Sequence, residues 1–332
     1  PQCLELDLDH EPLVGLSVAA GSNVAESLKR SGFADDRGLS IPLMRKLAEE
    51  KGFEHFLHGS VEVRDEKYRA TLAVHSVDAA KNSVEVQAED GDVFSLCDKI
   101  STSVQQSLDL PPEDLEATPD LPARDVSTTS IEALALLAKA TATNAFDNDT
   151  DAALALIDKA TQIDPSFAYA YKFKSQLLLS HNRWEQVGPT ITAALQHDYR
   201  LADSSKYALR VMKLWFLDSK PKLAVELARE YSKAHPRDLS ALQLLSMMEI
   251  MHGDEEAGLR ALENLQEVDD RPIYQFMRAQ TLLNMGRTEE ALPLLDTFLD
   301  SGNKEIEEGQ LSQALLLAAK ATRKMGKHEA AK

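Results

Sequence analysis

The residues best suited to bind a metal ion are the acids and amides at positions 147–151, which read DNDTD. Oxygen ligands at alternate positions are typical of an EF-hand calcium loop, and Asp158 stands at the twelfth place of this one. The sixth place is Ala152, where that loop requires Gly, and Asp158 is one methylene shorter than the usual Glu. These departures favour a simpler interpretation, in which the acids cap a helix that begins near Asp151.

The chain offers little other metal or thiol chemistry. It has two cysteines, Cys3 and Cys97, and no C-x-x-C pair, so the sequence predicts no structural zinc site. The two thiols could be unremarkable, or they could form a disulfide in an oxidising compartment, and both interpretations stay open. His55 and His58 lie three residues apart around an expected strand, where they would point to opposite faces and would not share a metal.

Catalytic motifs are also missing from the sequence. It contains no H-E-x-x-H, no G-x-S-x-G and no P-loop, so we expect neither an enzymatic activity nor a cofactor. The formal net charge is −18, from 36 basic and 54 acidic residues, and this average surface would repel a phosphate backbone. Nucleic-acid binding is therefore not expected of this chain.

The composition suits a folded, helix-rich chain of two domains. Of the 332 residues, 43% are hydrophobic and 6% aromatic, and no apolar run approaches the roughly 20 residues that span a bilayer. No signal peptide is evident, and the chain begins at Pro1 without Met. We therefore expect a piece of a longer protein, whose membrane segment, if it has one, would lie outside this piece.

Residues 109–129 separate two regions with different patterns. This stretch holds four prolines and many acids and has no apolar period, which predicts a linker. Before it, residues 56–63 and 68–77 read as an antiparallel hairpin, and residues 83–87 as a third strand. Helices are expected from Ser40 to about Lys51 and after Asp90-Gly91-Asp92, whose Asp residues suit an N-cap. Residues 1–108 thus predict a small α+β domain.

The region after the linker repeats with a period near 34 residues. Four positions illustrate the period: Ala153, Ile157, Ala160 and Pro165. The residues 34 positions further along the chain are Val187, Ile191, Ala194 and Tyr199. Further on, Gly253-Asp254 is followed 33 residues later by Gly286-Arg287, each between two amphipathic stretches. Small residues let the two helices of a unit approach closely, and Gly or Asn makes the turn between them. A single unit cannot bury its apolar face, so the units are expected to stack.

This pattern resembles the tetratricopeptide repeat. The clearest unit carries Tyr171, Ser175, Leu178, Asn182, Trp184, Val187, Ile191 and Ala194 at the family's positions. The resemblance implies an all-α superhelix of helix-turn-helix units at about 130–165, 168–199, 202–236, 239–270 and 272–301, with a partial unit at 305–332. Two residues depart from the family's pattern, Gly258 where Ala is usual and Tyr231 where a small residue is usual.

In such a stack the first helix of each pair lines a concave face. In this register the face would carry Tyr169, Lys172, Gln176, Leu179, Lys206, Lys213, Phe216, Gln243, Met247, Ile250, Phe276, Gln280 and Leu283. Three lysines in the groove of an acidic protein would favour an acidic peptide or a free carboxylate. The alternatives are that the lysines are ordinary solvated side chains, and that the apolar positions are buried against the α+β domain.

The first domain resembles a TolB-like α/β domain over about residues 16–107. The resemblance is carried by residues 57–61, which read LHGSV, by 70–80, which read ATLAVHSVDAA, and by 92–100, which read DVFSLCDKI. It implies an extracytoplasmic, periplasmic region of an inner-membrane protein, because such domains commonly precede tetratricopeptide repeats in CadC-like regulators and bacterial Ser/Thr kinases. A cytoplasmic location is the alternative.

Two functional hypotheses follow. The first is a non-catalytic sensory and protein-binding region of a larger bacterial membrane regulator of signalling or transcription, in which binding of a ligand or partner shifts the state of an output domain. The second is a free-standing tetratricopeptide scaffold that assembles protein complexes. Both predict a protein or peptide as the partner.

Overall fold

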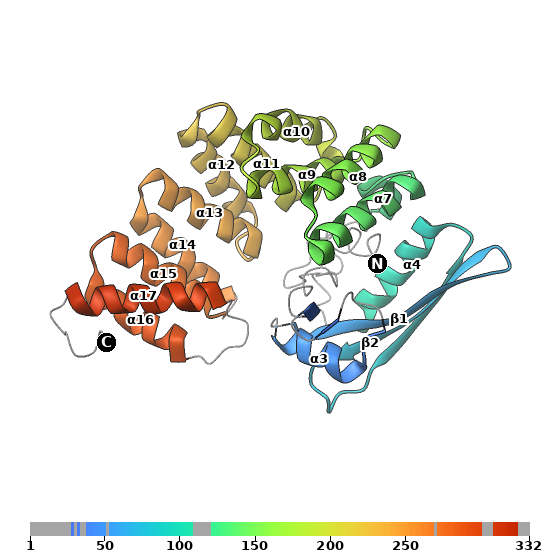
Figure 1. Ribbon diagram of the computed structural model, residues 1–332, viewed down its shortest axis with the longest axis horizontal. Helices are drawn as coiled ribbons and strands as arrows, with labels where there is room; N and C mark the ends of the chain where they lie inside the picture. Colours follow the sequence, from blue (N-terminus) through green and yellow to red (C-terminus); the bar gives the residue numbers. More distant parts are fainter. Residues whose placement is uncertain are drawn as a thin grey trace. The chain divides into compact units, whose positions relative to one another are not determined.

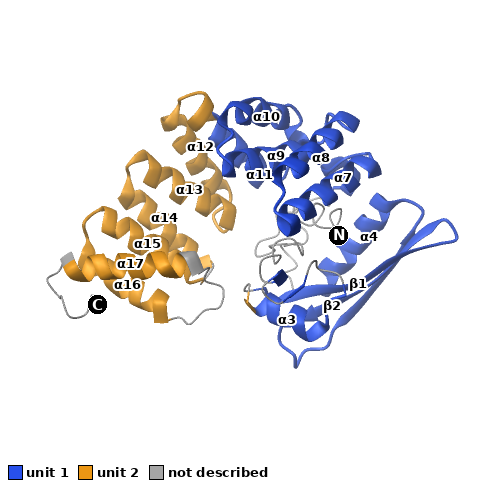
Figure 2. Cartoon of the chain, viewed as in Figure 1, with its two compact units in different colours: residues 1–49, 53–213 blue, residues 50–52, 214–332 orange. Residues whose placement is uncertain are grey.

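The computed structural model describes residues 28–29, 32–33, 38–50, 53–108, 121–268, 271–300 and 308–324. The chain divides into two compact units, unit 1 with residues 1–49 and 53–213, and unit 2 with residues 50–52 and 214–332 (Figure 2). This division falls inside the predicted repeat region. The predicted domain limits, 1–108 and 130–332, separate the α+β region from the repeat region, whereas the two units are separated by compactness. The predicted limits stay a prediction.

Unit 1 contains a three-stranded antiparallel sheet of order β1-β2-β3, formed by β1 (His55–Arg64), β2 (Lys67–Ser76) and β3 (Val84–Asp90) (Figure 1). Strands β1 and β2 are joined by a two-residue turn, Asp65 (φ 51°) and Glu66 (φ 62°), which matches the type I′ turns of tight hairpins. The three predicted strands and their antiparallel hairpin are confirmed.

Two helices accompany the sheet, α3 (Ile41–Glu50) and α4 (Val93–Ser107). Of the two Asp residues predicted to cap this helix, Asp92 is the N-cap of α4, and its Oδ2 accepts a hydrogen bond of 2.9 Å from the Ser95 amide. The apolar stripe of α4 packs on strands β2 and β3. This small core contains Ala70, Val74, Val86, Leu96, Ile100 and Val104.

The rest of unit 1 is built from paired helices that pack into one apolar core. The pairs are α7 (Ile131–Ala142) with α8 (Thr150–Ile163), and α9 (Ala168–Ser180) with α10 (Trp184–Gln196). The small residues Ala153 and Ala160 are fully buried in α8, together with Ile157. A short π-helix, η2 (Thr143–Asp147), a 3-10 helix, η3 (Asp198–Arg200), and helix α11 (Asp203–Met212) complete the described elements of this part.

Unit 2 continues with helix pairs of the same kind. It holds α12 (Pro221–Ala234), α13 (Leu239–His252), α14 (Glu255–Val268), α15 (Ile273–Asn284), α16 (Thr288–Asp300) and α17 (Glu308–Lys324). The short π-helix η4 (Lys213–Leu217) precedes them at the boundary. Gly253 (φ 91°) and Gly286 (φ 79°) end α13 and α15 in the left-handed conformation, which explains why glycine recurs there. The predicted fold class, a small α+β part followed by tetratricopeptide-like helix pairs, is confirmed.

The unusual glycine of the repeat pattern has a packing reason. A Cβ atom at Gly258 would lie 2.4 Å from Cγ1 of Ile250, on the facing helix α13. The large Ile250 side chain thus occupies the space that the family's usual Ala would fill.

The end of the predicted linker is folded in the described residues. Residues 123–126 form the short helix α6, and the Ala123 amide donates a hydrogen bond of 2.7 Å to Oδ1 of Asp98 on α4. The Arg124 guanidinium pairs with Asp92 (2.7 Å) and lies 4.6 Å from the centre of the Phe94 ring. We call residues 123–128 the joint, because they connect α4 to the first helix pair.

Asp164 anchors the other end of the joint. It is 8% exposed and accepts hydrogen bonds from the Thr128 hydroxyl and from the Ser166 amide (2.9 Å) and hydroxyl (2.6 Å). Arg200 donates to the Ser127 carbonyl (3.2 Å). Burial alone would raise the pKa of the Asp164 carboxyl, but the hydrogen bonds from Ser166 and Thr128, aided by Arg200, outweigh it and lower that pKa.

We expect Asp164→Asn to destabilise unit 1 by about 2 kcal/mol at pH 7, because charge-assisted hydrogen bonds are each worth about 1.5–3 kcal/mol. Since the folded pKa lies below the unfolded value of about 3.9, the carboxylate stabilises the protein above that value. The stabilisation is lost as the pH falls through the folded pKa. Urea titrations that follow Trp184 fluorescence in a Trp215→Phe background should show the difference shrinking below about pH 4; a constant difference would contradict this.

Candidate functional site

Three of the predicted site residues lie on one face of α9. Tyr169, Lys172 and Gln176 are spaced three and four residues apart, which places them on one helical face. The Lys172 ammonium lies 4.7 Å from the centre of the Tyr169 ring, which is a cation–π contact. Tyr169 and Lys172 are half-buried and Gln176 is exposed. This face combines an aromatic ring, a cation and an amide.

Two more lysines come from α11 and from the π-helix η4 after it. Lys206 is half-buried and its ammonium lies 2.9 Å from Oδ1 of Asp203. Lys213 is half-buried as well, and its side chain is also engaged within the protein. Asp203 is exposed, so the ion pair is partly screened by solvent and contributes little to stability.

In unit 2, α13 carries the predicted residues Gln243 and Met247. The Gln243 side chain donates a hydrogen bond of 3.0 Å to the hydroxyl of Tyr274 on α15. Gln243 therefore joins two helices as well as lining the surface. Met247 is 43% exposed, and Met251, one turn further along the same face, is 44% exposed. The two methionines form an adaptable apolar strip, the kind of surface that accommodates varied partners.

The two predicted residues on α15 differ in their environments. Phe276 is only 5% exposed and stacks on Phe298 of α16, with ring centres 5.1 Å apart. The structure thus corrects its expected place on the concave face, because its ring belongs to the core and offers no surface to a partner. Gln280, one turn later, is half-buried.

The acidic run 147–151 acts as a helix start in the structure. Asp149 is the N-cap of α8, and its Oδ1 accepts a hydrogen bond of 2.9 Å from the Ala152 amide. Asp151 pairs with Arg183 (2.6 Å) and Asp158 pairs with Lys174. The capping interpretation is confirmed, because these carboxylates are committed to a cap and to separate cations. The described residues contain no group of three or more His, Cys, Asp or Glu side chains that could hold a metal.

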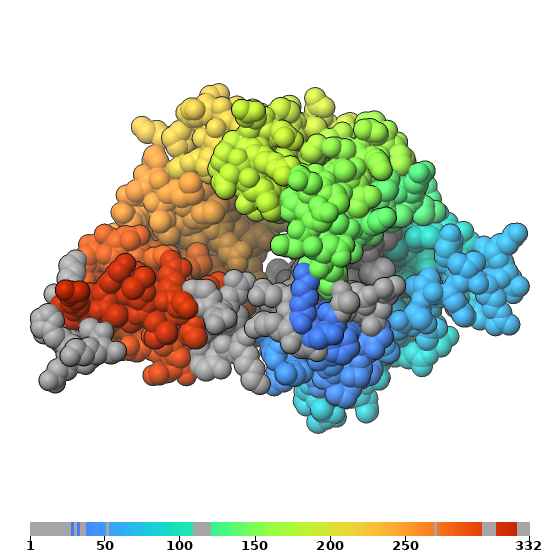
Figure 3. All heavy atoms as spheres, in the orientation of Figure 1, coloured from blue at the N-terminus to red at the C-terminus, as the bar shows by residue number. Residues whose placement is uncertain are grey.

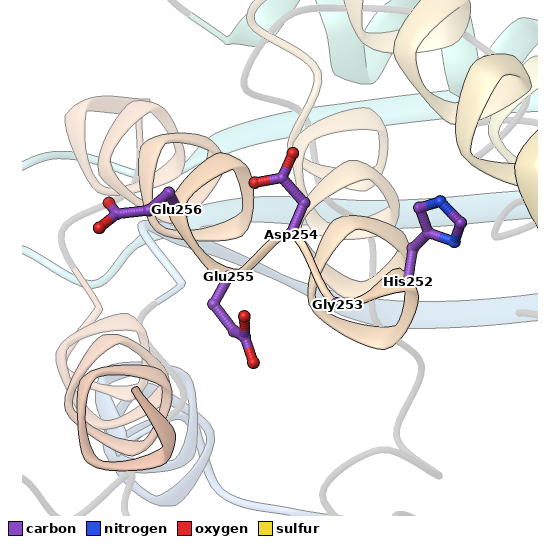
Figure 4. Close-up of a pocket in the computed structure, with 5 residues that line it drawn as sticks. All are labelled: His252, Gly253, Asp254, Glu255 and Glu256. Carbon is purple, nitrogen blue, oxygen red and sulfur yellow. The ribbon is translucent and has the colours of Figure 1, made fainter. Parts of the chain in front are cut away.

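A shallow depression lies at the turn between α13 and α14, lined by residues 252–256 (Figure 4). The side chains of this turn fan out rather than converge on one point (Figure 4). Asp254 accepts a hydrogen bond from the Ala257 amide (3.0 Å), and Glu256 pairs with Arg287 (2.9 Å). The Asp254 side chain caps the start of α14, and the side chains of this turn do not form a catalytic arrangement.

Sequence reasoning missed Met251, although its spacing of four residues from Met247 is a signal that could have found it. Of the two cysteines, Cys97 is buried in α4, and Cys3 lies outside the described residues. The candidate Cys3–Cys97 disulfide therefore stays a prediction. No helix in the described part of the chain is long and apolar enough to span a membrane.

Comparisons with solved structures identify tetratricopeptide proteins. PilW, a widely conserved type IV pilus biogenesis factor, is 15% identical with a TM-score of 0.51, over 61% of this chain and 90% of that one. A thermophilic TPR protein of Thermus thermophilus is 18% identical (TM-score 0.44), over 55% of this chain and 99% of that one. YrrB, a TPR protein with an unusual peptide-binding site, is 20% identical (TM-score 0.37), over 55% and 91%. No family model and no curated protein matches the sequence.

Proposed function

We propose that this chain is a non-catalytic module that binds proteins or peptides through the first helices of its tetratricopeptide-like pairs. One observation carries the proposal: these helices present polar and apolar side chains that the packing of the pairs leaves accessible. In unit 1 these are Lys172, Tyr169 and Gln176, and in unit 2 they are Met247 and Met251. Helix pairs of this fold form extended surfaces for other chains.

A scaffold that assembles protein complexes is the simplest form of this function. The fold, which PilW shares, supports it, and no membrane segment or output domain is needed. The acidic or carboxylate character of the ligand is a further part of the proposal. It rests on Lys172, Lys206 and Lys213, which are accessible cations in a chain of net charge −18.

A sensory region of a bacterial membrane regulator is the second candidate, and the joint favours it. Asp98 and Asp92 of α4 bind the joint at one end, and Asp164 binds it at the other. Such a polar connection could pass a shift in the helix pairs to the sheet domain. The TolB-like nature of that domain, its periplasmic location and a CadC-like or kinase output rest on sequence resemblance.

The peptide-binding proposal can be tested with labelled short peptides of four kinds: acidic, basic, neutral, and acidic with an amidated C-terminus. We expect fluorescence polarisation to show a preference for the acidic peptides with a free carboxylate. The triple variant Lys172→Glu, Lys206→Glu, Lys213→Glu should weaken it at least about tenfold at roughly 0.15 M ionic strength.

A matched control reverses three exposed lysines elsewhere in unit 1, Lys81, Lys139 and Lys159, and makes the same change in net charge. This variant should retain most of the binding. If both variants lose binding equally, the preference is a long-range effect of charge and the lysine site is wrong. If the first variant binds like the wild type, the lysines do not contact the peptide.

A further inference from the structure

Strand β1 is a long edge strand in the described part of the chain, and it approaches β2 closely at Gly59, where a Cβ would lie 2.1 Å from the Thr71 carbonyl oxygen. It pairs with β2 on one side over all ten of its residues, without a bulge, and it contains no proline. The β1–β2 hairpin lies at the surface of unit 1 (Figures 1 and 3). Natural sheets usually protect such edges with prolines, bulges or short strands, because an open edge pairs readily with another strand. Strand β1 has none of these three protections, and the charged side chains within it are Glu62 and Arg64.

The edge also carries an uncovered apolar row. Leu57, Val61 and Val63 are 36%, 56% and 69% exposed. They face the same side of the sheet as the buried Ala70 and Val74, because their cross-strand partners are Val74, Ala70 and Tyr68. Helix α4 covers this side over β2 and β3, so the apolar side continues past the helix onto β1.

The backbone of β1 is in the right phase to accept another strand. In a hairpin with a two-residue turn, the flanking pair, Arg64 and Lys67, is the hydrogen-bonded kind. Even-numbered residues of β1 therefore bond to β2. The amide and carbonyl groups of the odd-numbered residues, Leu57, Gly59, Val61 and Val63, point to the open edge.

The hairpin is electrically neutral in an acidic chain. Residues 55–76 contain three acids (Glu62, Asp65, Glu66) and three bases (Arg64, Lys67, Arg69), so their formal charge is 3 − 3 = 0. The whole chain carries −18. A second copy of this chain would be repelled by the average surface but can approach this edge.

The sequence of β1 is complementary to itself when read antiparallel about Ser60. Leu57 then faces Val63 of the second copy on the apolar side, and His58 faces Glu62 of the second copy on the other side. Arg64 faces the aromatic ring of Phe56, and no like charges meet. Moving the centre to Gly59 places Phe56 opposite Glu62, and moving it to Val61 places His58 opposite Arg64. Centring the pairing between two residues would place odd-numbered residues opposite even-numbered ones, and the apolar rows of the two copies would then lie on opposite faces of the sheet.

We propose that β1 is a self-association strand: two copies of the chain pair their β1 strands antiparallel about Ser60 and form one continuous six-stranded sheet. The apolar row of each copy packs against that of the other. This inference does not depend on the peptide-binding function. A dimer of this kind would also present two sets of helix pairs, which raises the avidity for a partner with two sites.

Sedimentation of the full chain over a range of concentrations tests the association. We expect a reversible dimer for the wild type. Val61→Pro should weaken it at least tenfold, because residue 61 directs its amide to the open edge and the pairing with β2 is spared. Val61→Lys should weaken it similarly, because each copy then brings a new charge to the strand pair. Thr71→Lys is the control, since it adds the same charge at an exposed site of β2 and should leave the dimer intact.

A cysteine at the centre tests the register. In a Cys3→Ser background, Ser60→Cys should form an intermolecular disulfide on oxidation, because facing residues of a non-hydrogen-bonded pair lie about 4.5 Å apart. Glu62→Cys is the matched control on the same side of β1. Its two copies would be four residues apart along the strands, about 13 Å, which is too far to bridge.

Three results would overturn the proposal. One is a wild type that stays monomeric at all concentrations, and another is a dimer that persists in both Val61 variants. The third is equal cross-linking of Ser60→Cys and Glu62→Cys. Trp184 fluorescence and circular dichroism must show each variant folded, so that loss of the dimer is not loss of the fold.

Discussion

Arg229→Met is expected to destabilise unit 2 by about 3 kcal/mol, the low end of the range for removing one member of a buried ion pair. Arg229 on α12 binds Glu249 on α13 through two hydrogen bonds, Nε to Oε1 (2.5 Å) and Nη2 to Oε2 (2.8 Å). The Glu249 side chain is 4% exposed, whereas that of Arg229 is 51% exposed. Without the guanidinium, a carboxylate would remain buried between two helices with no partner to replace its lost water.

The measurement is a urea titration that follows Trp215 in a Trp184→Phe background, since Trp215 is the tryptophan of unit 2. The double variant Arg229→Met, Glu249→Met should recover much of the lost stability, because it removes the buried charge together with its partner. Arg287→Met, which removes pairs with the exposed Glu290 and Glu256, should destabilise unit 2 far less than Arg229→Met, because solvent-exposed ion pairs contribute little. Similar losses for Arg229→Met and Arg287→Met would show that the burial of Glu249 has no energetic consequence.

Local signals predicted much of the fold. The caps at Asp92 and Asp149 and the glycines at the ends of α13 and α15 depend only on neighbouring residues, so the sequence contains all that is needed to find them. The alternation of Tyr68, Ala70, Leu72 and Val74 indicated a strand for the same reason. The small residues Ala153 and Ala160 were predicted to lie at a close helix contact, and both are fully buried.

The surface residues were harder to predict, because a helix in a stacked array is buried on more than one side. Helix α15 shows the problem. Phe276 and Gln280 lie one turn apart, yet the Phe276 ring stacks on Phe298 of the next helix while Gln280 stays half-buried. Which face meets the next pair depends on contacts between helices far apart in sequence, such as Gln243 with Tyr274. Helical periodicity gives the faces but does not say which neighbour covers each one.

Tyr231 is the residue for which the family pattern and the structure make opposite predictions. The pattern favours a small residue, so Tyr231→Ala should be tolerated. In the structure, however, the Tyr231 ring is fully buried and lies edge-on to His235, with ring centres 5.2 Å apart. Its hydroxyl donates a hydrogen bond of 2.7 Å to Oδ2 of Asp238. The other oxygen of Asp238 caps α13, since it accepts from the Ser240 (2.7 Å) and Ala241 (3.2 Å) amides.

We therefore expect Tyr231→Ala to destabilise unit 2 by about 3–5 kcal/mol, because it leaves an aromatic-sized cavity between α12 and α13. Tyr231→Phe should cost about 1.5–2 kcal/mol, because it keeps the ring and removes only the hydrogen bond to the capping carboxylate. Combining Tyr231→Phe with Asp238→Asn in a double-mutant cycle, followed by Trp215 fluorescence, measures the coupling between hydroxyl and cap. A cost below about 1 kcal/mol for Tyr231→Ala would show that the helices move together and fill the cavity, as expected if a small residue fits this position.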